Sequence, residues 1–156
     1  MTKYALIRKN RIPALQVISE NEDTRYVNNA EDAYVLAKEE GICDLPEEYL
    51  YLIALNTRNR VLGIFEVSHG DSEKTLVSIP QILTRALLVG SKRIIIMHNH
   101  PSGDVTPSSF DSSFTNDLNK ACDVLKIKFE DHLIVSEKTY ISYSDAGHLW
   151  GYFPKE

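Results

Sequence analysis

The first part of the chain combines short runs that favour β-structure with one amphipathic segment. Residues 3–8 and 14–19 are separated by Asn10-Arg11-Ile12-Pro13, a spacing that predicts a β-hairpin. Further on, Asn29 is a candidate N-cap followed by acidic residues, and Gly41 ends the periodic segment. We therefore expect a hairpin followed by a helix.

Beyond this part, strongly apolar runs of strand length alternate with two helical segments. Pro80 is well placed to open a helix that Gly90 closes. A second helix is predicted over residues 109–126, with one apolar face made of Phe110, Phe114, Leu118, Ala121 and Leu125. The predicted strands cover residues 49–56, 60–68, 93–100, 127–136 and 139–143.

This order of elements predicts a mixed β-sheet flanked by helices, an α/β or α+β fold. We expect residues 1–44 to form an accessory hairpin and helix, and residues 45–156 to form the main domain. The hydrophobic share of 43% and the charged share of 25% are those of an ordinary globular protein. A chain of 156 residues can bury a real core without disulfides.

Composition narrows the classes of function. The net charge of −5 argues against a protein that binds nucleic acid mainly through phosphate contacts. The local exception is Arg8-Lys9-Asn10-Arg11, which a turn with solvated charges explains equally well. No run approaches the roughly 20 apolar residues of a membrane span, and the N-terminus has no signal-peptide pattern. Cys43 and Cys122 are far apart and lie in no C-x-x-C pair, so we expect reduced thiols and a cytoplasmic location.

The most informative segment begins where the apolar run ending at Met97 stops. Side chains two residues apart on a strand point to the same face, so His98 and His100 project together. Pro101 removes a backbone donor and helps to end the strand there. Two imidazoles on one face of a buried strand end lie at a separation that a single metal ion can bridge.

The third ligand is expected from the start of the next helix. Ser108 is a good N-cap, and Asp111 lies three residues later in the first helical turn. The short loop after Pro101 can fold this turn back over the strand end. Two nitrogens and one carboxylate oxygen leave a fourth tetrahedral position open to water, which is the ligand count of a catalytic zinc site. We therefore predict a mononuclear zinc site formed by His98, His100 and Asp111.

Each of these residues also has a simpler explanation. Ser108-x-x-Asp111 can be only a capping box with Asp in place of Glu. His98 and His100 can be hydrogen-bonded core histidines. The metal site is favoured because two histidines on one face, a strand-ending proline and a carboxylate at a helix start occur together, and a core does not need that combination.

The same segment resembles the JAMM signature of JAB/MPN-domain metalloproteins. Its spacing is H-x-H-P-x(6)-S-x-x-D, and the run His98-Asn99-His100-Pro101-Ser102-Gly103-Asp104 is similar to the RadC branch. Further similar stretches begin at Leu52 and Asp131, and the resemblance extends from about Pro46 to the C-terminus. It implies a JAB/MPN fold, related to that of the cytidine deaminases, and a zinc cofactor.

The resemblance also implies roles for three further residues. In JAMM enzymes a glutamate near the start of the first domain strand is the general base, and Glu48 stands at the matching position. Glu66, near the end of the returning strand, is the competing candidate. Ser108 matches the serine that donates a hydrogen bond to the developing oxyanion. Asp131 and His132 are interpreted as structural, although one of them can orient a metal ligand.

Three functions are consistent with this pattern. The first is a zinc-dependent hydrolase of peptide or isopeptide-like bonds. The second is a DNA-repair or mobile-element accessory protein whose metal site acts on nucleic acid. Longer RadC proteins carry an upstream helix-hairpin-helix segment that residues 1–45 do not resemble, and the family tends to have Arg-Glu where this chain has Gln81-Ile82. The third is a non-catalytic interaction module, against which an intact ligand set argues. The sequence leaves the substrate and the oligomeric state open.

Overall fold

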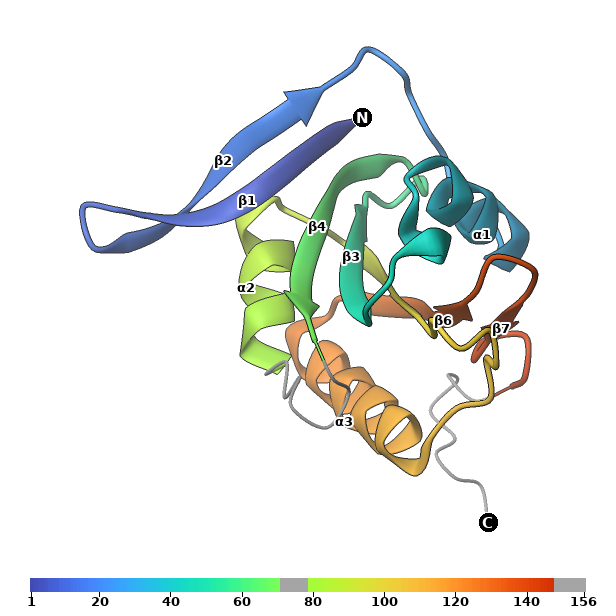
Figure 1. The fold of residues 1–156 in the computed structure, drawn as a ribbon. Helices are drawn as coiled ribbons and strands as arrows, with labels where there is room; N and C mark the ends of the chain where they lie inside the picture. Colours follow the sequence, from blue (N-terminus) through green and yellow to red (C-terminus); the bar gives the residue numbers. More distant parts are fainter. Residues whose placement is uncertain (71–78, 148–156) are drawn as a thin grey trace.

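The computed structural model describes residues 1–70 and 79–147 of the chain. Within these residues a mixed seven-stranded sheet is flanked by three α-helices, which confirms the predicted α+β fold (Figure 1). The strands are β1 (Thr2–Lys9), β2 (Ile12–Glu20), β3 (Tyr49–Leu55), β4 (Val61–His69), β5 (Arg93–Asn99), β6 (Lys128–Val135) and β7 (Tyr140–Ser142). The helices are α1 (Ala30–Glu39), α2 (Ile79–Leu88), α3 (Ser109–Leu125) and a short 3₁₀ helix, η1 (Ile42–Asp44).

The strand order is β2-β1-β4-β3-β5-β6-β7, with β3 and β5 near the centre. β3 pairs with both β4 and β5 in antiparallel fashion, whereas β5 and β6 are parallel and are connected through α3. Antiparallel strands can be joined by tight turns, but a parallel pair needs a long crossover, which explains why the helix follows β5. The crossover places the start of α3 near the end of β5.

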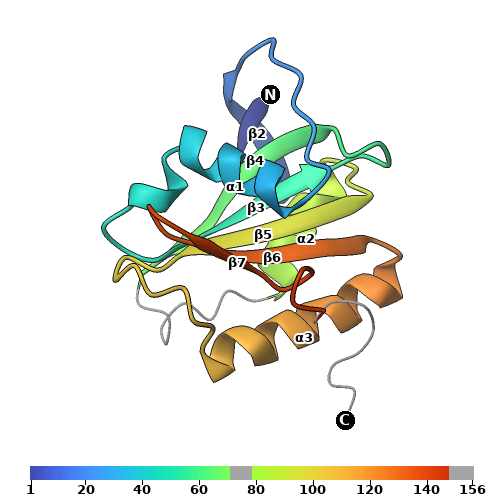
Figure 2. The same ribbon diagram turned by 90° about the vertical axis from the view of Figure 1, so that its right-hand side faces the viewer.

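The helices cover the two faces of the sheet (Figure 2). Side chains alternate along β3, so Leu52 faces α2 and α3 while Ile53 faces α1. In β5, Ile94 and Ile96 share the face of α3, and Ile95 and Met97 share the face of α1. A sheet buried on both sides requires nearly continuous apolar strands, which is the pattern that β3 and β5 show.

The predicted hairpin and first helix are both present. Asn10 and Arg11 have φ angles of 51° and 67°, as the central residues of a tight hairpin turn require. The Asn29 side chain accepts a hydrogen bond from the Asp32 N–H and caps α1. Gly41 follows with a φ of 71° in the left-handed region. The boundary between an accessory part and a main domain at residue 45 stays a prediction, and residues 71–78 and 148–156 of that proposed domain lie outside the described residues.

The hairpin joins the body of the sheet through the pairing of β1 with β4. β1 pairs with β4 in parallel through Lys3 and Ile64. The Tyr4 ring lies over Gly63, where a Cβ atom would come within 2.6 Å of the ring, and stacks on Phe65 with 5.4 Å between ring centroids. Glycine is therefore required at residue 63 for the hairpin to pack here.

The predicted apolar face of α3 is only partly the buried one. Leu118 is fully buried, but Phe110 and Leu125 are exposed, and Phe114 and Ala121 are half-buried. The residues that α3 buries are Asp111, Thr115, Leu118, Asn119 and Cys122. The helix is rotated so that polar side chains near its start enter the protein, which a count of apolar spacing does not detect.

The two cysteines, Cys43 and Cys122, are both buried and free. Burial raises the pKa of Cys43 to about 11 and that of Cys122 to about 12, so both thiols are protonated and unreactive at neutral pH. Among the described residues, no helix has the length and apolar character needed to cross a membrane.

Candidate metal centre

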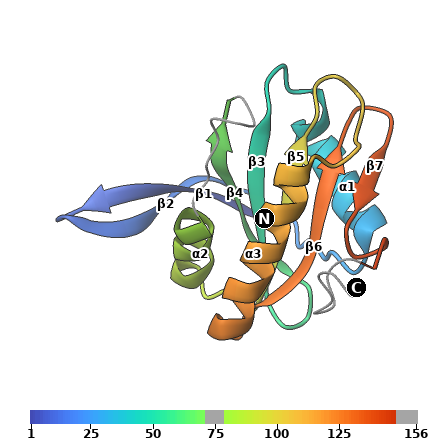
Figure 3. The ribbon, with the colours of Figure 1, turned by 90° about the horizontal axis from the view of Figure 1, so that it is seen from below.

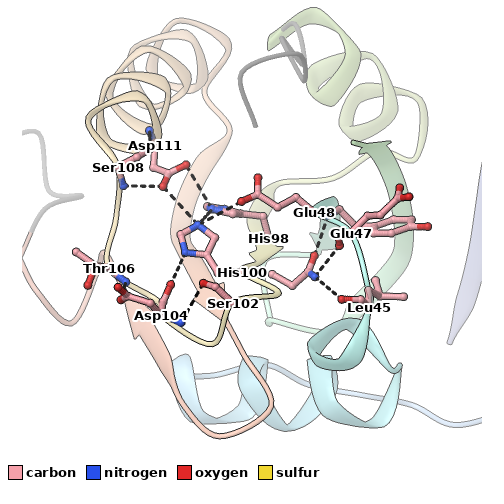
Figure 4. A network of polar contacts seen from close by, with 12 residues as sticks. Leu45, Glu47, Glu48, His98, His100, Ser102, Asp104, Thr106, Ser108 and Asp111 are labelled. Carbon is pink, nitrogen blue, oxygen red and sulfur yellow. Dashed lines mark hydrogen bonds and ion pairs between the residues drawn. The ribbon is translucent and has the colours of Figure 1, made fainter. Parts of the chain in front are cut away.

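His98 and His100 stand at the end of β5, on the face of the sheet that α3 covers (Figure 4). His98 lies opposite Leu50 of β3, in line with Ile94 and Ile96 on the same face. The two Nε2 atoms are 3.0 Å apart. The alternation of a strand therefore brings the two imidazoles together as predicted.

Asp111 reaches the two histidines from the first turn of α3. Its Oδ1 lies 3.3 Å from His98 Nε2, and its Oδ2 lies 3.6 Å from His100 Nε2. The capping box is also present, because Ser108 N–H donates to Asp111 Oδ2 and Asp111 N–H donates to Ser108 Oγ. The two explanations of Ser108-x-x-Asp111 are thus compatible, since one carboxylate caps the helix and faces the imidazoles at once.

The three side chains fit a divalent metal ion. One ligand atom from each lies within 4.8 Å of the others, and His98 and Asp111 are buried while His100 is partly exposed. Zinc bonds of about 2.0–2.1 Å at tetrahedral angles separate neighbouring ligand atoms by about 3.3 Å. The distances of 3.0, 3.3 and 3.6 Å between the facing atoms scatter around that value.

The other nitrogen of each imidazole has a partner that fixes its proton. His100 Nδ1 lies 2.7 Å from the Asp104 carbonyl oxygen, which can only accept, so Nδ1 carries the proton and Nε2 carries a lone pair. His98 Nδ1 lies 2.7 Å from His132 Nε2. The direction of that bond is set by the contact of His132 with Thr115.

Thr115 and His132 form a short hydrogen-bond relay that ends at His98 Nδ1. Thr115 Oγ1 donates to the Asp111 carbonyl oxygen at 2.6 Å and therefore accepts from His132 Nδ1, which is 2.5 Å away. His132 Nε2 then carries a lone pair and accepts from His98 Nδ1–H. His98 Nε2 is left as an acceptor that faces the acceptor Nε2 of His100. Two lone pairs 3.0 Å apart repel each other unless a cation, either a metal ion or a proton, lies between them.

The sequence favoured a structural interpretation of His132 and left open that it orients a metal ligand; the structure agrees with the second, since His132 contacts a candidate ligand. It is almost fully buried and stacks on Tyr143 with ring planes 6° apart. In the parallel ladder His98 pairs with Ile134, so His132 is diagonal to His98 on the same face. The sequence signal was the single histidine within an apolar strand, and its use depended on knowing that β5 and β6 are neighbours. Asp131 is structural as interpreted, since it accepts from Ser142 Oγ and Ser144 N–H.

The protonation states of Asp111 and His132 at neutral pH favour the binding of a cation. Burial alone would raise the pKa of Asp111, but the adjacent imidazoles of His100 and His98 and the hydrogen bond from Ser108 N–H hold it well below its usual range. The nearby Asp111 carboxylate stabilises the protonated imidazole and so raises the pKa of His100, against the effect of burial. Burial lowers the pKa of His132 well below its usual value. Asp111 is therefore ionised and His132 neutral, which is the state that the relay requires.

Of the two candidate bases, the structure brings Glu48 to the site and not Glu66. Glu48 Oε1 lies 3.9 Å from His100 Nε2, and its side chain is about one quarter exposed, at 26%. Glu66 of β4 pairs with Tyr51 of β3 and lines a different cavity together with Lys3 and Arg85. Proximity to the imidazoles thus distinguishes the two glutamates.

Asn99 holds the backbone on both sides of Glu48, a function that the sequence did not indicate. Its side chain is fully buried on the face opposite to the histidines. Its amide donates to the carbonyl oxygens of Leu45 and Glu47 and accepts from Tyr49 N–H at 2.8 Å. The residue between the two histidines therefore ties β5 to the segment that carries Glu48.

A cavity of about 600 Å³ opens beside the site. His100 forms part of its wall, together with the loop after β5, the η1 segment and the turn between β6 and β7. Its lining includes the polar residues Asp44, Ser102, Ser136, Glu137 and Lys138. The volume is in the range of sites that take a small molecule or part of a longer ligand, about 300–1,000 Å³.

Comparison with known proteins gives one family and many relatives. Residues 27–148 match the family described as RadC-like JAB domain, so the match begins within the predicted accessory part. A UPF0758 protein of Desulfitobacterium hafniense is 37% identical over 123 residues, which are 79% of this chain and 54% of that protein. A UPF0758 protein of Clostridium kluyveri is 38% identical over 127 residues, 81% of this chain and 55% of that protein.

A relative with lower identity is matched over a similar part of this chain. A UPF0758 protein of Flavobacterium johnsoniae is 32% identical over 121 residues, 78% of this chain and 52% of that protein. The chain spans about half the length of the curated relatives it matches. Their names state no activity, so any chemistry must be argued from the residues themselves.

Proposed function

Because the chain belongs to the RadC-like JAB domain family, we propose that it is a zinc-dependent hydrolase of amide bonds of the peptide or isopeptide type. His98, His100 and Asp111 hold the metal ion. Glu48 is the general base, and Ser108 is a hydrogen-bond donor to the oxygen of the bond that is cleaved.

The observation that carries this proposal is the convergence of three ligand atoms whose hydrogen bonds leave lone pairs pointing at one another. His98 Nε2 and His100 Nε2 both act as acceptors and lie within 3.6 Å of an ionised carboxylate oxygen. A structural zinc site uses four protein ligands, whereas a catalytic one uses three and keeps one position for water or substrate. Three ligands among the described residues favour the catalytic type.

Glu48 lies close enough to the candidate ligands to take the proton of the attacking water. When bound, zinc supplies Lewis acidity, polarising a carbonyl group and lowering the pKa of water to about 7. The Glu48 carboxylate is partly exposed and lies on the side of His100 that faces the ligand cluster (Figure 4). It can accept a proton from water and return it to the leaving amine. Asn99 fixes the backbone on either side and so limits the positions that this carboxylate can reach.

Ser108 serves this chemistry through the hydroxyl hydrogen that capping leaves unused. Its Oγ accepts from Asp111 N–H, and an acceptor role in a cap does not consume the O–H donor. A donor beside the metal ligands can stabilise negative charge on a tetrahedral oxygen. The same residue thus caps α3 and supports the reaction.

The proposed substrate is a protein or peptide, and a proteome-derived peptide library provides the probe. Zinc-loaded protein is incubated with the library, and new amino termini are counted by mass spectrometry. We expect Glu48→Gln to retain zinc and lose the new termini, and Glu66→Gln to leave both unchanged. Equal cleavage by the wild type and Glu48→Gln would exclude Glu48 as the base.

A nucleic-acid substrate is the alternative outcome of the same test. If the zinc-loaded wild type cleaves a single- or double-stranded DNA probe and does not cleave the library, the metal site acts on nucleic acid instead of peptides. Binding to DNA at low salt that disappears as salt is raised would support that change, because phosphate contacts release counterions. We expect neither result, since the net charge of the chain is −5.

A further inference from the structure

The hairpin of β1 and β2 leaves the outer edge of the sheet without a neighbouring strand in the part of the chain that the structure describes. β2 is the terminal strand in the sheet order and contains nine residues. The hairpin extends away from the body of the molecule (Figures 1 and 3). A row of backbone N–H and C=O groups along such an edge is a template for pairing with another strand.

Several exposed side chains of the hairpin are apolar. No residue from Thr2 to Glu20 is buried. On β2, Ile12 and Ile18 are each 66% exposed and Val17 is 50% exposed. A two-stranded ribbon is marginally stable in water. β1 pairs with β4 at Lys3, so the part of the hairpin beyond this point has only its own two strands, and a further strand beside β2 would widen the sheet there.

Charge along the hairpin is separated into two ends. The turn carries exposed Arg8, Lys9 and Arg11. The opposite end carries exposed Glu20, Glu22 and Asp23. The Met1 ammonium bonds to backbone oxygens at the second end. Lys3 and Arg25 form ion pairs with Glu40 and Glu39 outside the hairpin, so the second end is acidic on balance.

This separation is self-complementary in one arrangement. When two copies of β2 lie antiparallel and are centred near Gln16 or Val17, the basic turn of each copy lies beside the acidic end of the other. A parallel arrangement would instead place like charges together. Opposite charges across an interface favour the correct register and suppress the wrong one. Pro13 lacks an N–H, which leaves residues 14–20 for continuous pairing.

We propose that β2 pairs antiparallel with β2 of a second copy of this chain, forming a two-fold symmetric homodimer with one continuous sheet. A two-fold interface uses the same surface on both copies, and β2 offers such a surface in its apolar side chains and its opposed charges. The hairpin precedes the matched region, residues 27–148, so the proposal does not depend on the chemistry of the metal site.

The first test is the mass of the purified protein in solution, measured by light scattering during gel filtration and by sedimentation over a wide concentration range. The wild type is expected to show a dimer that dissociates on dilution. Ile18→Lys places a charge at the exposed centre of the interface twice, once in each copy. It should weaken the dimer at least about tenfold, which corresponds to roughly 1.4 kcal/mol.

Charge exchange provides a stricter test. Arg11→Asp and Glu20→Lys should each weaken the dimer, and the double variant should restore it because the charges are again opposed. Aspartate is chosen because residue 11 has a φ of 67°, a region that Asp tolerates better than most residues. Lys120→Asp, at an exposed position of α3, is the control and should leave the dimer unchanged. A wild type that is monomeric at all concentrations, or a double variant no tighter than the single ones, would overturn the proposal.

Discussion

Asp131→Asn is expected to stabilise the protein at neutral pH and to remove part of its pH dependence. Asp131 is 5% exposed, and its Oδ1 accepts from His132 N–H and Ser144 N–H. Its Oδ2 accepts from Ser142 Oγ, which also accepts from Asp145 N–H. An asparagine amide can occupy the same place, because its oxygen accepts the two backbone bonds and its NH₂ group donates to the Ser142 hydroxyl.

The magnitude follows from the pKa of the carboxyl. Burial raises the pKa of Asp131 from 3.8 to about 6, against the lowering effect of its hydrogen bonds. The folded state therefore holds the proton more tightly than the unfolded state. Ionisation adds no penalty below pH 3.8, a growing one up to about pH 6, and the full penalty above that. Two pKa units correspond to about 3 kcal/mol at 1.36 kcal/mol per unit.

Urea denaturation of the metal-free protein between pH 4 and pH 8 measures this effect. At the acidic end the wild type and Asp131→Asn should have similar free energies of unfolding. The variant should become the more stable by up to about 3 kcal/mol near neutral pH, which for a chain of this size is a rise in Tm of roughly 6–12 °C. All other titrating groups are shared by the two proteins and cancel in the difference. A difference that stays constant over this pH range would refute the assignment of a raised pKa to Asp131.

Three further substitutions test the supports of the site. His132→Phe keeps a ring in the core but removes the acceptor for His98 Nδ1–H, so zinc affinity measured by chelator competition should fall roughly 10–100-fold; unchanged affinity would contradict the relay. Asn99→Ala leaves Tyr49 N–H and two carbonyl groups without their partner, which should lower the free energy of unfolding by about 2–4 kcal/mol in a urea titration. Ser108→Ala removes the cap of α3 and should cost about 1 kcal/mol in the same assay, whereas no loss would show that the cap is not needed.

The backbone pattern was largely predictable because apolar spacing reflects local geometry. The strands around the site were predicted to within one or two residues, since buried strands are almost continuously apolar. The pairing of His98 with His100 followed from strand alternation alone. Asp111 was predictable because a short loop and an N-cap fix where the next helix begins.

The contacts that support the site could not be predicted because the residues that make them are distant in sequence. His132 contacts His98 only through the parallel pairing of β5 and β6. Asn99 contacts a segment more than fifty residues earlier in the chain. The apolar spacing of α3 pointed to Phe110 and Leu125, because it treats Asp111 and Thr115 as solvent-facing when the site requires them inside. Polar side chains thus take buried positions on α3 where the candidate site lies.

The zinc content of the protein shows directly whether two imidazoles and a carboxylate hold one metal ion. Protein stripped with a chelator is reloaded with zinc, dialysed and measured by elemental mass spectrometry. The wild type should hold about one zinc ion per chain, the count of a mononuclear site. The double variant His98→Ala/His100→Ala should hold essentially none, while His69→Ala, at an exposed histidine, should match the wild type. Zinc content that is unchanged in the double variant would contradict the account.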